Sequence, residues 1–69
     1  MKYLVTGAAG FIGTHLIKEL LKIPKNLIYG IDRKKIKVKN SRLIKIKKDI
    51  KNINKFPNVD YVFHMAAYN

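Results

Sequence analysis

Three glycines, Gly7, Gly10 and Gly13, stand between a short apolar run and an amphipathic stretch. This turn constrains the fold more than any other feature of the chain. Residues 2–6 are mostly β-branched and aromatic, as in a buried strand. From Phe11 onward, apolar residues recur at steps of three and four until the next proline, which predicts a helix with one apolar face. A strand, a glycine turn and a helix in this order indicate an α/β fold.

The glycine positions suit a turn that binds phosphate. The chain must bend sharply, approach the phosphates with its backbone and pack the new helix closely, and a β-carbon hinders each of these. Free N–H groups of the first helical turn then face the phosphate oxygens, supported by the helix dipole. Asp32 ends the next apolar run, 19 residues after Gly13, where a carboxylate accepts hydrogen bonds from ribose hydroxyls. A purely structural glycine turn, with Asp32 capping a loop, is the less favoured alternative.

The rest of the chain alternates apolar runs with polar connections. Residues 33–40 are mostly cationic and are expected to form a loop. Residues 50–56 are predicted to form a short helix, with Asp49 as its cap and Pro57 as its breaker. Near-continuous apolar runs are typical of parallel strands buried on both faces. The further predicted strands are residues 27–31, 43–46 and 60–65.

Three segments carry a resemblance to a known family. Residues 6–13, Thr-Gly-Ala-Ala-Gly-Phe-Ile-Gly, resemble the TGxxGFxG fingerprint of the extended short-chain dehydrogenases/reductases, the NAD-dependent epimerase/dehydratase group. Residues 48–50, Lys-Asp-Ile, are similar to the acidic and aliphatic pair that holds the adenine ring in that family. Residues 62–67 resemble its HxAA segment, whose backbone lies along the cofactor. The matches occur in the family's order and span nearly the whole chain.

This resemblance implies a fold and a set of cofactor contacts. The fold is the N-terminal half of a Rossmann-type doubly wound parallel sheet, incomplete and with strand order 3-2-1-4. Residues 1–69 would form one partial NAD(P)-binding domain. The implied cofactor-binding residues are Gly7, Gly10, Phe11, Ile12 and Gly13 around the pyrophosphate, Asp32 at the adenosine ribose, Asp49 and Ile50 at the adenine, and Ala66 and Ala67 beneath the cofactor.

The residues after the second strand bear on the choice of cofactor. Asp32 favours NAD, because a carboxylate at that position would repel the 2′-phosphate of NADP. Arg33, Lys34 and Lys35 follow at once, and these cations could accommodate that phosphate or simply form a solvated loop. NAD is therefore the predicted cofactor, with NADP as the alternative.

The resemblance also implies a catalytic Tyr-x-x-x-Lys pair, with the tyrosine as acid/base during hydride transfer. No tyrosine of this chain has a lysine four positions later. His64 is interpreted as a hydrogen-bonded strand residue rather than a general base, so no catalytic residue is predicted. We expect the N-terminal part of a nucleotide-sugar epimerase/dehydratase-type oxidoreductase, inactive by itself. A non-catalytic dinucleotide-binding remnant is the alternative.

The composition raises one further alternative. The chain has 69 residues, with 15 Lys+Arg against 4 Asp+Glu and a net charge of +11, which suits a nucleic-acid-binding module. Thirteen of the cations are Lys, whereas phosphate and base recognition favours Arg, so this reading is less favoured. The chain has no Cys, which excludes disulfide scaffolds and zinc knuckles. No apolar run approaches the roughly 18 residues of a membrane helix, and a cytoplasmic location is expected.

Overall fold

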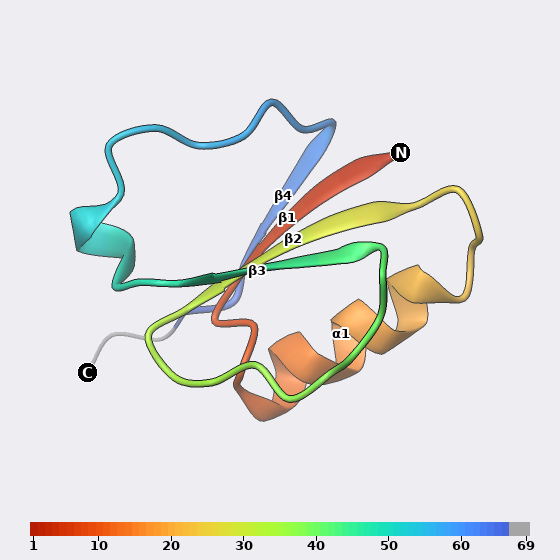
Figure 1. Ribbon diagram of the computed structural model, residues 1–69, viewed down its shortest axis with the longest axis horizontal. Coiled ribbons are helices and arrows are strands. Elements are labelled where there is room, and N and C mark those ends of the chain that lie inside the picture. Colours follow the sequence, from red (N-terminus) through yellow and green to blue (C-terminus); the bar gives the residue numbers. More distant parts are fainter. Residues whose placement is uncertain (67–69) are drawn as a thin grey trace.

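The computed structural model describes residues 1–66 of the chain. Its centre is a parallel four-stranded sheet in the order β3-β2-β1-β4 (Figure 1). This order confirms the α/β class and the strand order expected from the sequence. The elements are β1 (Lys2–Thr6), α1 (Phe11–Leu21), β2 (Leu27–Asp32), β3 (Leu43–Lys47), the 3-10 helix η1 (Ile50–Asn52) and β4 (Tyr61–His64).

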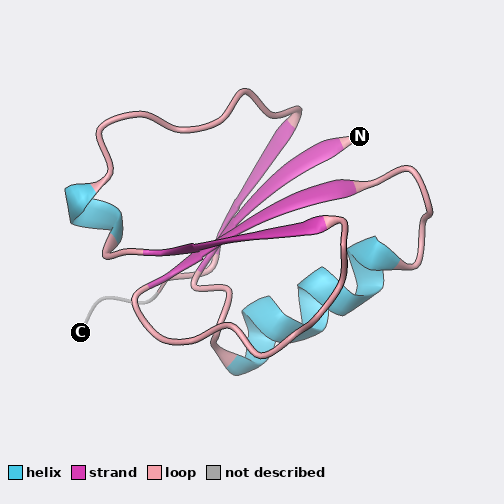
Figure 2. Cartoon of the chain, in the orientation of Figure 1, coloured by secondary structure: helices cyan, strands magenta, loops and turns pink. Residues whose placement is uncertain are grey.

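The helix α1 covers one face of the sheet, while the connection over residues 48–60 runs on the other side (Figure 2). Ile17 and Leu21 are the buried aliphatic residues of α1, and they pack with Val5 of β1 and Ile28 of β2. The β2–β3 connection contains no helix, yet its Ile36 side chain is only 3% exposed and completes the same core. A loop therefore fills the space that a second crossover helix would otherwise occupy.

The predicted helix over residues 50–56 is wrong beyond its first turn, because η1 ends at Asn52. Asp49 does act as its cap, since its carboxylate accepts a hydrogen bond from the backbone N–H of Lys51 at 3.0 Å. Every residue of η1 is at least partly exposed. A helix of this length is stable only when tertiary packing of an apolar face supports it, and none of the η1 residues is buried.

Two polar side chains from outside the helix hold the C-terminal end of α1. The Arg42 guanidinium donates to the carbonyl oxygens of Leu21 at 2.7 Å, Ile23 at 2.8 Å and Asn26 at 3.1 Å. Asn26 is itself buried, and its side-chain amide donates to the Leu20 carbonyl at 2.9 Å. Because the last carbonyls of a helix have no partner within it, these bonds stabilise the end of α1 against the sheet.

We expect the isolated chain to melt at a low temperature with a broad transition. A chain of this size hides only about 60% of the surface that it exposes when unfolded. Apolar side chains at both edges of the sheet remain open, with Ile44 of β3 40% exposed and Val62 of β4 59% exposed. Circular dichroism recorded as a function of temperature measures the midpoint and the width of the unfolding transition. A single sharp transition above about 65 °C, the upper end for ordinary domains, would contradict it.

Candidate functional site

A cleft of about 500 Å³ lies where the carboxyl ends of the four strands meet. Ligands of open α/β sheets bind outside the carboxyl ends of the strands, at the point where the strand order reverses. In this sheet that point lies between β1 and β4, because the chain crosses from β3 to the far side of β1. The lining residues come from residues 6–10, 31–34, 48–51 and 65–66.

The glycine turn forms one wall of this cleft and is tightly packed. Gly7 has a φ of +69°, and a β-carbon there would lie 2.7 Å from the backbone nitrogen of Ala66. A β-carbon on Gly13 would overlap the carbonyl oxygen of Gly7. The first glycine therefore permits both the bend and the close passage of the β4 end, and Gly13 permits α1 to pack against the turn.

The N-terminus of α1 opens at this turn. Gly10 is the cap residue and has no side chain to bond the free N–H groups of the first helical turn. The Thr14 hydroxyl donates to the carbonyl oxygen of Ala8 at 3.1 Å and so links the helix to the turn. Uncapped N–H groups together with the helix dipole favour an anion at this position.

Asp32 ties the end of β2 to the glycine turn. One carboxylate oxygen accepts a hydrogen bond from the backbone N–H of Ala9 at 2.9 Å, and the other accepts from the N–H of Lys34 at 2.8 Å. Each oxygen of a carboxylate accepts about two hydrogen bonds, so both retain capacity for ligand hydroxyls. The backbone carbonyl of Asp32 accepts from the N–H of Lys48, which draws the end of β3 to the same place.

The end of β3 contributes charged and apolar lining side by side. Asp49 and Ile50 line the cleft as the sequence predicted, and Lys48 and Lys51 flank them. Arg33 and Lys34 line it from the end of β2. Sequence reasoning missed the two lysines around Asp49 as site residues, although their position directly after a predicted strand was an available signal.

Thr6 also lines the cleft, and sequence reasoning missed it as well. It is 1% exposed, its hydroxyl lies 2.8 Å from Nδ1 of His64, and it accepts a bond from the N–H of Ala66 at 3.4 Å. These contacts hold the end of β4 against Gly7. His64 is hydrogen-bonded, as its interpretation from the sequence expected, and it does not line the cleft. A polar residue at the end of a buried strand was the only signal for Thr6.

Not all predicted cofactor residues face the cleft. Phe11 is 91% exposed and Ile12 63% exposed at the start of α1, and Gly13 is buried beneath it. Ala67 lies outside the described residues. The cofactor-binding roles of all ten predicted residues stay predictions. The predicted residues that do line the cleft are Gly7, Gly10, Asp32, Asp49, Ile50 and Ala66.

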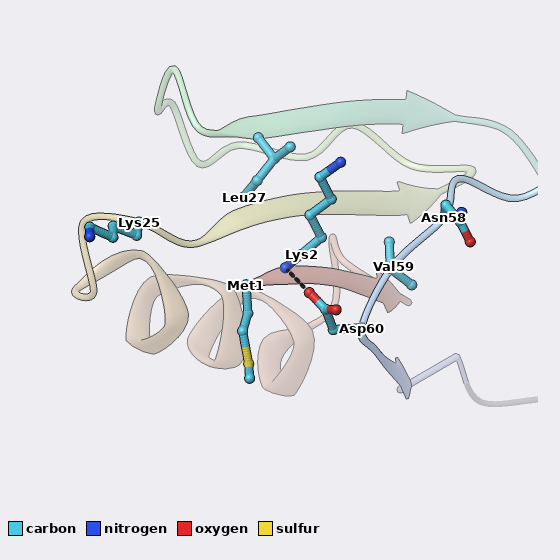
Figure 3. A pocket seen from close by; sticks show the side chains of 7 residues that line it. All are labelled: Met1, Lys2, Lys25, Leu27, Asn58, Val59 and Asp60. Atoms are coloured by element: carbon cyan, nitrogen blue, oxygen red, sulfur yellow. Dashed lines mark hydrogen bonds between the residues drawn. The ribbon is translucent and has the colours of Figure 1, made fainter.

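A second hollow of about 570 Å³ lies at the opposite, amino ends of the strands (Figure 3). Its one carboxylate, Asp60, already accepts a hydrogen bond from the backbone N–H of Lys2 at 2.8 Å. It has neither a glycine turn nor a helix N-terminus, so the carboxyl-end cleft is the candidate site despite its smaller volume. The hollow is lined by Met1, Lys2, Lys25, Leu27, Asn58, Val59 and Asp60.

Residues 1–66 contain neither a metal-binding cluster nor a membrane-spanning helix. No group of three or more histidine, cysteine, aspartate or glutamate side chains in this part of the chain could hold a metal ion. Within the same residues, no helix has the length and apolar character needed to span a membrane.

Comparison with known families decides the identity of this fold. Residues 3–69 match the sequence profile of the NAD-dependent epimerase/dehydratase family. The chain belongs to this family. The match includes every segment that lines the cleft of this epimerase-family chain: the glycine turn, the ends of β2 and β4, and residues 48–51.

Curated relatives of the chain are much longer. It is 41% identical to an uncharacterized UDP-glucose epimerase, YtcB, of Bacillus subtilis strain 168. The alignment has 83 positions and covers 97% of this chain and 26% of that protein. It is 38% identical over 65 residues to the protein CapI of Staphylococcus aureus, covering 88% of this chain and 19% of the relative. The chain thus spans about a quarter of the length of these relatives or less.

Solved structures agree with this assignment. The UDP-glucuronic acid 4-epimerase of Bacillus cereus, solved in complex with NAD, is 37% identical with a TM-score of 0.87, over 100% of this chain and 28% of that one. MoeE5, solved in complex with UDP-glucose and NAD, is 37% identical with a TM-score of 0.81, over 99% of this chain and 23% of that one. The chain therefore has the fold of the N-terminal part of these enzymes.

Proposed function

We propose that this chain forms the NAD-binding N-terminal portion of a nucleotide-sugar epimerase/dehydratase-type oxidoreductase. The observation that carries the proposal is the hydrogen bond from the Ala9 N–H to the Asp32 carboxylate at 2.9 Å. It joins the predicted ribose-binding group and the predicted phosphate-binding turn into a single cradle. The UDP-glucuronic acid 4-epimerase of Bacillus cereus was solved with NAD bound, and it shares the fold over the whole of this chain.

The cradle fits a dinucleotide in two respects. Gly7 lets the end of β4 pass close to the turn, and Gly10, which has no side chain, leaves the N–H groups at the start of α1 open to phosphate oxygens. The carboxylate of Asp32 would accept hydrogen bonds from the ribose hydroxyls, while Asp49 and Ile50 would contact the adenine. Ala66 would support the half of the cofactor that extends toward the nicotinamide.

These positions indicate which part of the reaction this chain would contribute. Bound NAD supplies the hydride acceptor and donor of such reactions. The residues of this chain would bind and orient it, and the chain has no Tyr-x-x-x-Lys pair to move the substrate proton. Proton transfer and recognition of the sugar nucleotide would therefore come from residues beyond those of this sequence.

Replacing Asp32 by alanine is expected to weaken NAD binding about tenfold or more, equivalent to about 1.4 kcal/mol, because charge-assisted hydrogen bonds to the ribose are lost. Wild-type protein should bind NAD more tightly than NADP, and the substitution should narrow that difference by removing the carboxylate that opposes the 2′-phosphate. Isothermal titration with each dinucleotide measures both effects.

Asp60→Ala is the matched control for that titration. Asp60 also accepts one backbone hydrogen bond, but it lies at the amino ends of the strands. It should leave NAD affinity unchanged. Equal NAD affinity in the Asp32 variant and the wild type would show that this carboxylate does not hold the ribose.

A cationic stretch supports a second candidate function, nucleic-acid binding. Residues 33–51 contain ten Lys and Arg and one Asp. The ion pair seen within residues 1–66 lies outside this stretch: Lys22 and Glu19 of the α1 region are 2.6 Å apart, and Lys22 holds the pKa of the Glu19 carboxyl below its usual value. The cations of residues 33–51 are thus not neutralised by ion pairs in the described part of the chain. Titration with duplex DNA at several salt concentrations separates the two functions, since binding through phosphates falls steeply with salt.

A further inference from the structure

The connection from β2 to β3 alternates aliphatic residues that face the core with lysines that face solvent. Ile36 is 3% exposed, and Val38 packs against the same core. A β-carbon on Gly30 of β2 would lie 3.3 Å from the Ile36 side chain, so the connection crosses the sheet over Gly30. Because the aliphatic side chains point toward the sheet, the lysines beside them are exposed. These are Lys35, Lys37 and Lys39.

The edge strand β3 adds two exposed lysines on the same side of the sheet. Strand alternation places Lys45 and Lys47 on the face of Leu43, which is buried in one core with Ile36. Lys45 is also the register partner of Gly30, the residue over which Ile36 lies. Figure 1 shows the β2–β3 connection on the side of the sheet that α1 covers. The five exposed lysines therefore border one surface, here called the lysine surface: Lys35, Lys37, Lys39, Lys45 and Lys47.

The carboxylates of the chain are bound elsewhere. It has four aspartate and glutamate side chains. Asp32, Asp49 and Asp60 each accept hydrogen bonds from backbone N–H groups. Glu19 pairs with Lys22 of the α1 region. Within residues 1–66, none of the four forms an ion pair with the lysine surface. Five like charges gathered on one surface create a strong positive potential, which attracts a partner that carries many negative charges.

The side chains of the lysine surface favour one kind of polyanion. Proteins that bind single-stranded nucleic acid stack its bases on aromatic side chains, and the surface has none. Binding to a lipid membrane uses apolar side chains that enter the bilayer, whereas Ile36 and Val38 point into the core. Lysine ammonium groups are compact charges that only donate, and they suit phosphate oxygens without reading base edges. The surface therefore fits the backbone of a nucleic-acid duplex.

We propose that the lysine surface binds the phosphate backbone of duplex DNA without regard to base sequence. This inference rests on the second candidate function, which it assigns to particular residues, and it does not rest on NAD binding. None of the five lysines lines the carboxyl-end cleft, so a duplex and a dinucleotide can bind at the same time. Five lysine–phosphate contacts predict a slope of about −4.5 for the logarithm of the binding constant against the logarithm of the salt concentration.

Fluorescence anisotropy with a labelled DNA duplex tests the proposal on the protein that contains residues 1–69. Titrations run from about 50 to about 200 mM salt, the range over which such contacts weaken. The double variant Lys37→Gln/Lys39→Gln should reduce the magnitude of the slope by about 1.8 and weaken binding at low salt about tenfold or more. Lys2→Gln/Lys55→Gln is the matched control and should bind like the wild type. It removes the same charge from the amino-end hollow and from the connection on the other side of the sheet (Figure 2).

Several outcomes would overturn the proposal. Equal loss of duplex binding in the two double variants, or no loss in either, refutes the lysine surface and leaves the second candidate function standing. A wild-type slope smaller in magnitude than about 2 refutes both, whether or not the variants fold, because too few phosphates would be contacted. Tighter binding of single-stranded DNA, duplex RNA or vesicles that contain phosphatidylserine would assign the surface to a different partner.

Two further measurements complete this test. The circular dichroism spectrum of each variant checks that it is folded, and exposed lysines should change stability little. Saturating NAD should leave the affinity for the duplex unchanged, and a large loss of affinity would place the duplex in the cleft instead. Absence of NAD binding with intact duplex binding would refute the NAD-binding function and leave the lysine surface standing.

Discussion

Gly7→Ala is expected to unfold the isolated chain or to leave it without measurable NAD binding. The residue has a φ of +69°, a conformation that costs an alanine roughly 1–2 kcal/mol. Its new β-carbon would also lie 2.7 Å from the backbone of Met65 and Ala66, where no side-chain rotation relieves the overlap. We expect a total loss above about 3 kcal/mol, which is most of the stability of so small a domain.

Gly10→Ala is the matched control, since it adds the same methyl group to the same turn. Gly10 has a φ of −73°, and the nearest atom to its β-carbon would be the carbonyl oxygen of Gly7 at 3.3 Å. We expect a loss below about 1 kcal/mol, close to the difference between the two residues at a helix cap. Urea unfolding followed by circular dichroism measures both variants. Similar midpoints for the two would show that the passage of β4 over Gly7 is not a constraint.

Arg42→Met should produce the second largest effect, a loss of about 2–4 kcal/mol. The substitution keeps the apolar stem but removes a guanidinium that donates to the carbonyl oxygens of Leu21, the last residue of α1, and of Ile23 and Asn26 in the connection after it. Hydrogen bonds from charged donors contribute about 1.5–3 kcal/mol each, and solvent recovers part of this because Arg42 is only half-buried. The free energy of unfolding in urea measures the loss.

Two further variants separate the fork geometry from the charge. Arg42→Lys keeps the charge but presents a single ammonium group, so it should lose most of the same stability. Arg33→Met removes one positive charge from an exposed side chain and should change the unfolding free energy by less than about 0.5 kcal/mol. If Arg42→Lys were as stable as the wild type, the positive charge, rather than the forked set of guanidinium N–H donors, would hold the end of α1.

Several features of the fold were predictable because their causes are local. The alternation and composition of residues 2–6 and 43–46 place β1 and β3, and the spacing of apolar residues after Phe11 places α1. The glycine spacing places the turn between them. The family resemblance implies the strand order 3-2-1-4, and the structure confirms it.

Other features depend on contacts between distant parts of the chain. The helix expected over residues 50–56 is one 3-10 turn, because helix formation at this length needs a packing surface that the fold does not supply. Arg42 looked like one more cation in a basic stretch, yet it bonds to carbonyls about 20 residues away. Thr6 looked like a strand residue, and its bond to His64 spans 58 positions.

The sequence by itself determined that this chain contains a strand, a glycine turn and a helix of a parallel α/β sheet, because strand composition, helical periodicity and glycine spacing act over a few residues. Only the tertiary structure decided how these parts meet. It brings the Asp32 carboxylate to the N–H of Ala9, draws the end of β4 over Gly7, and leaves Tyr61 and Val62 exposed on opposite faces of β4. These depend on strand pairing across 20 to 60 residues, which no local pattern encodes.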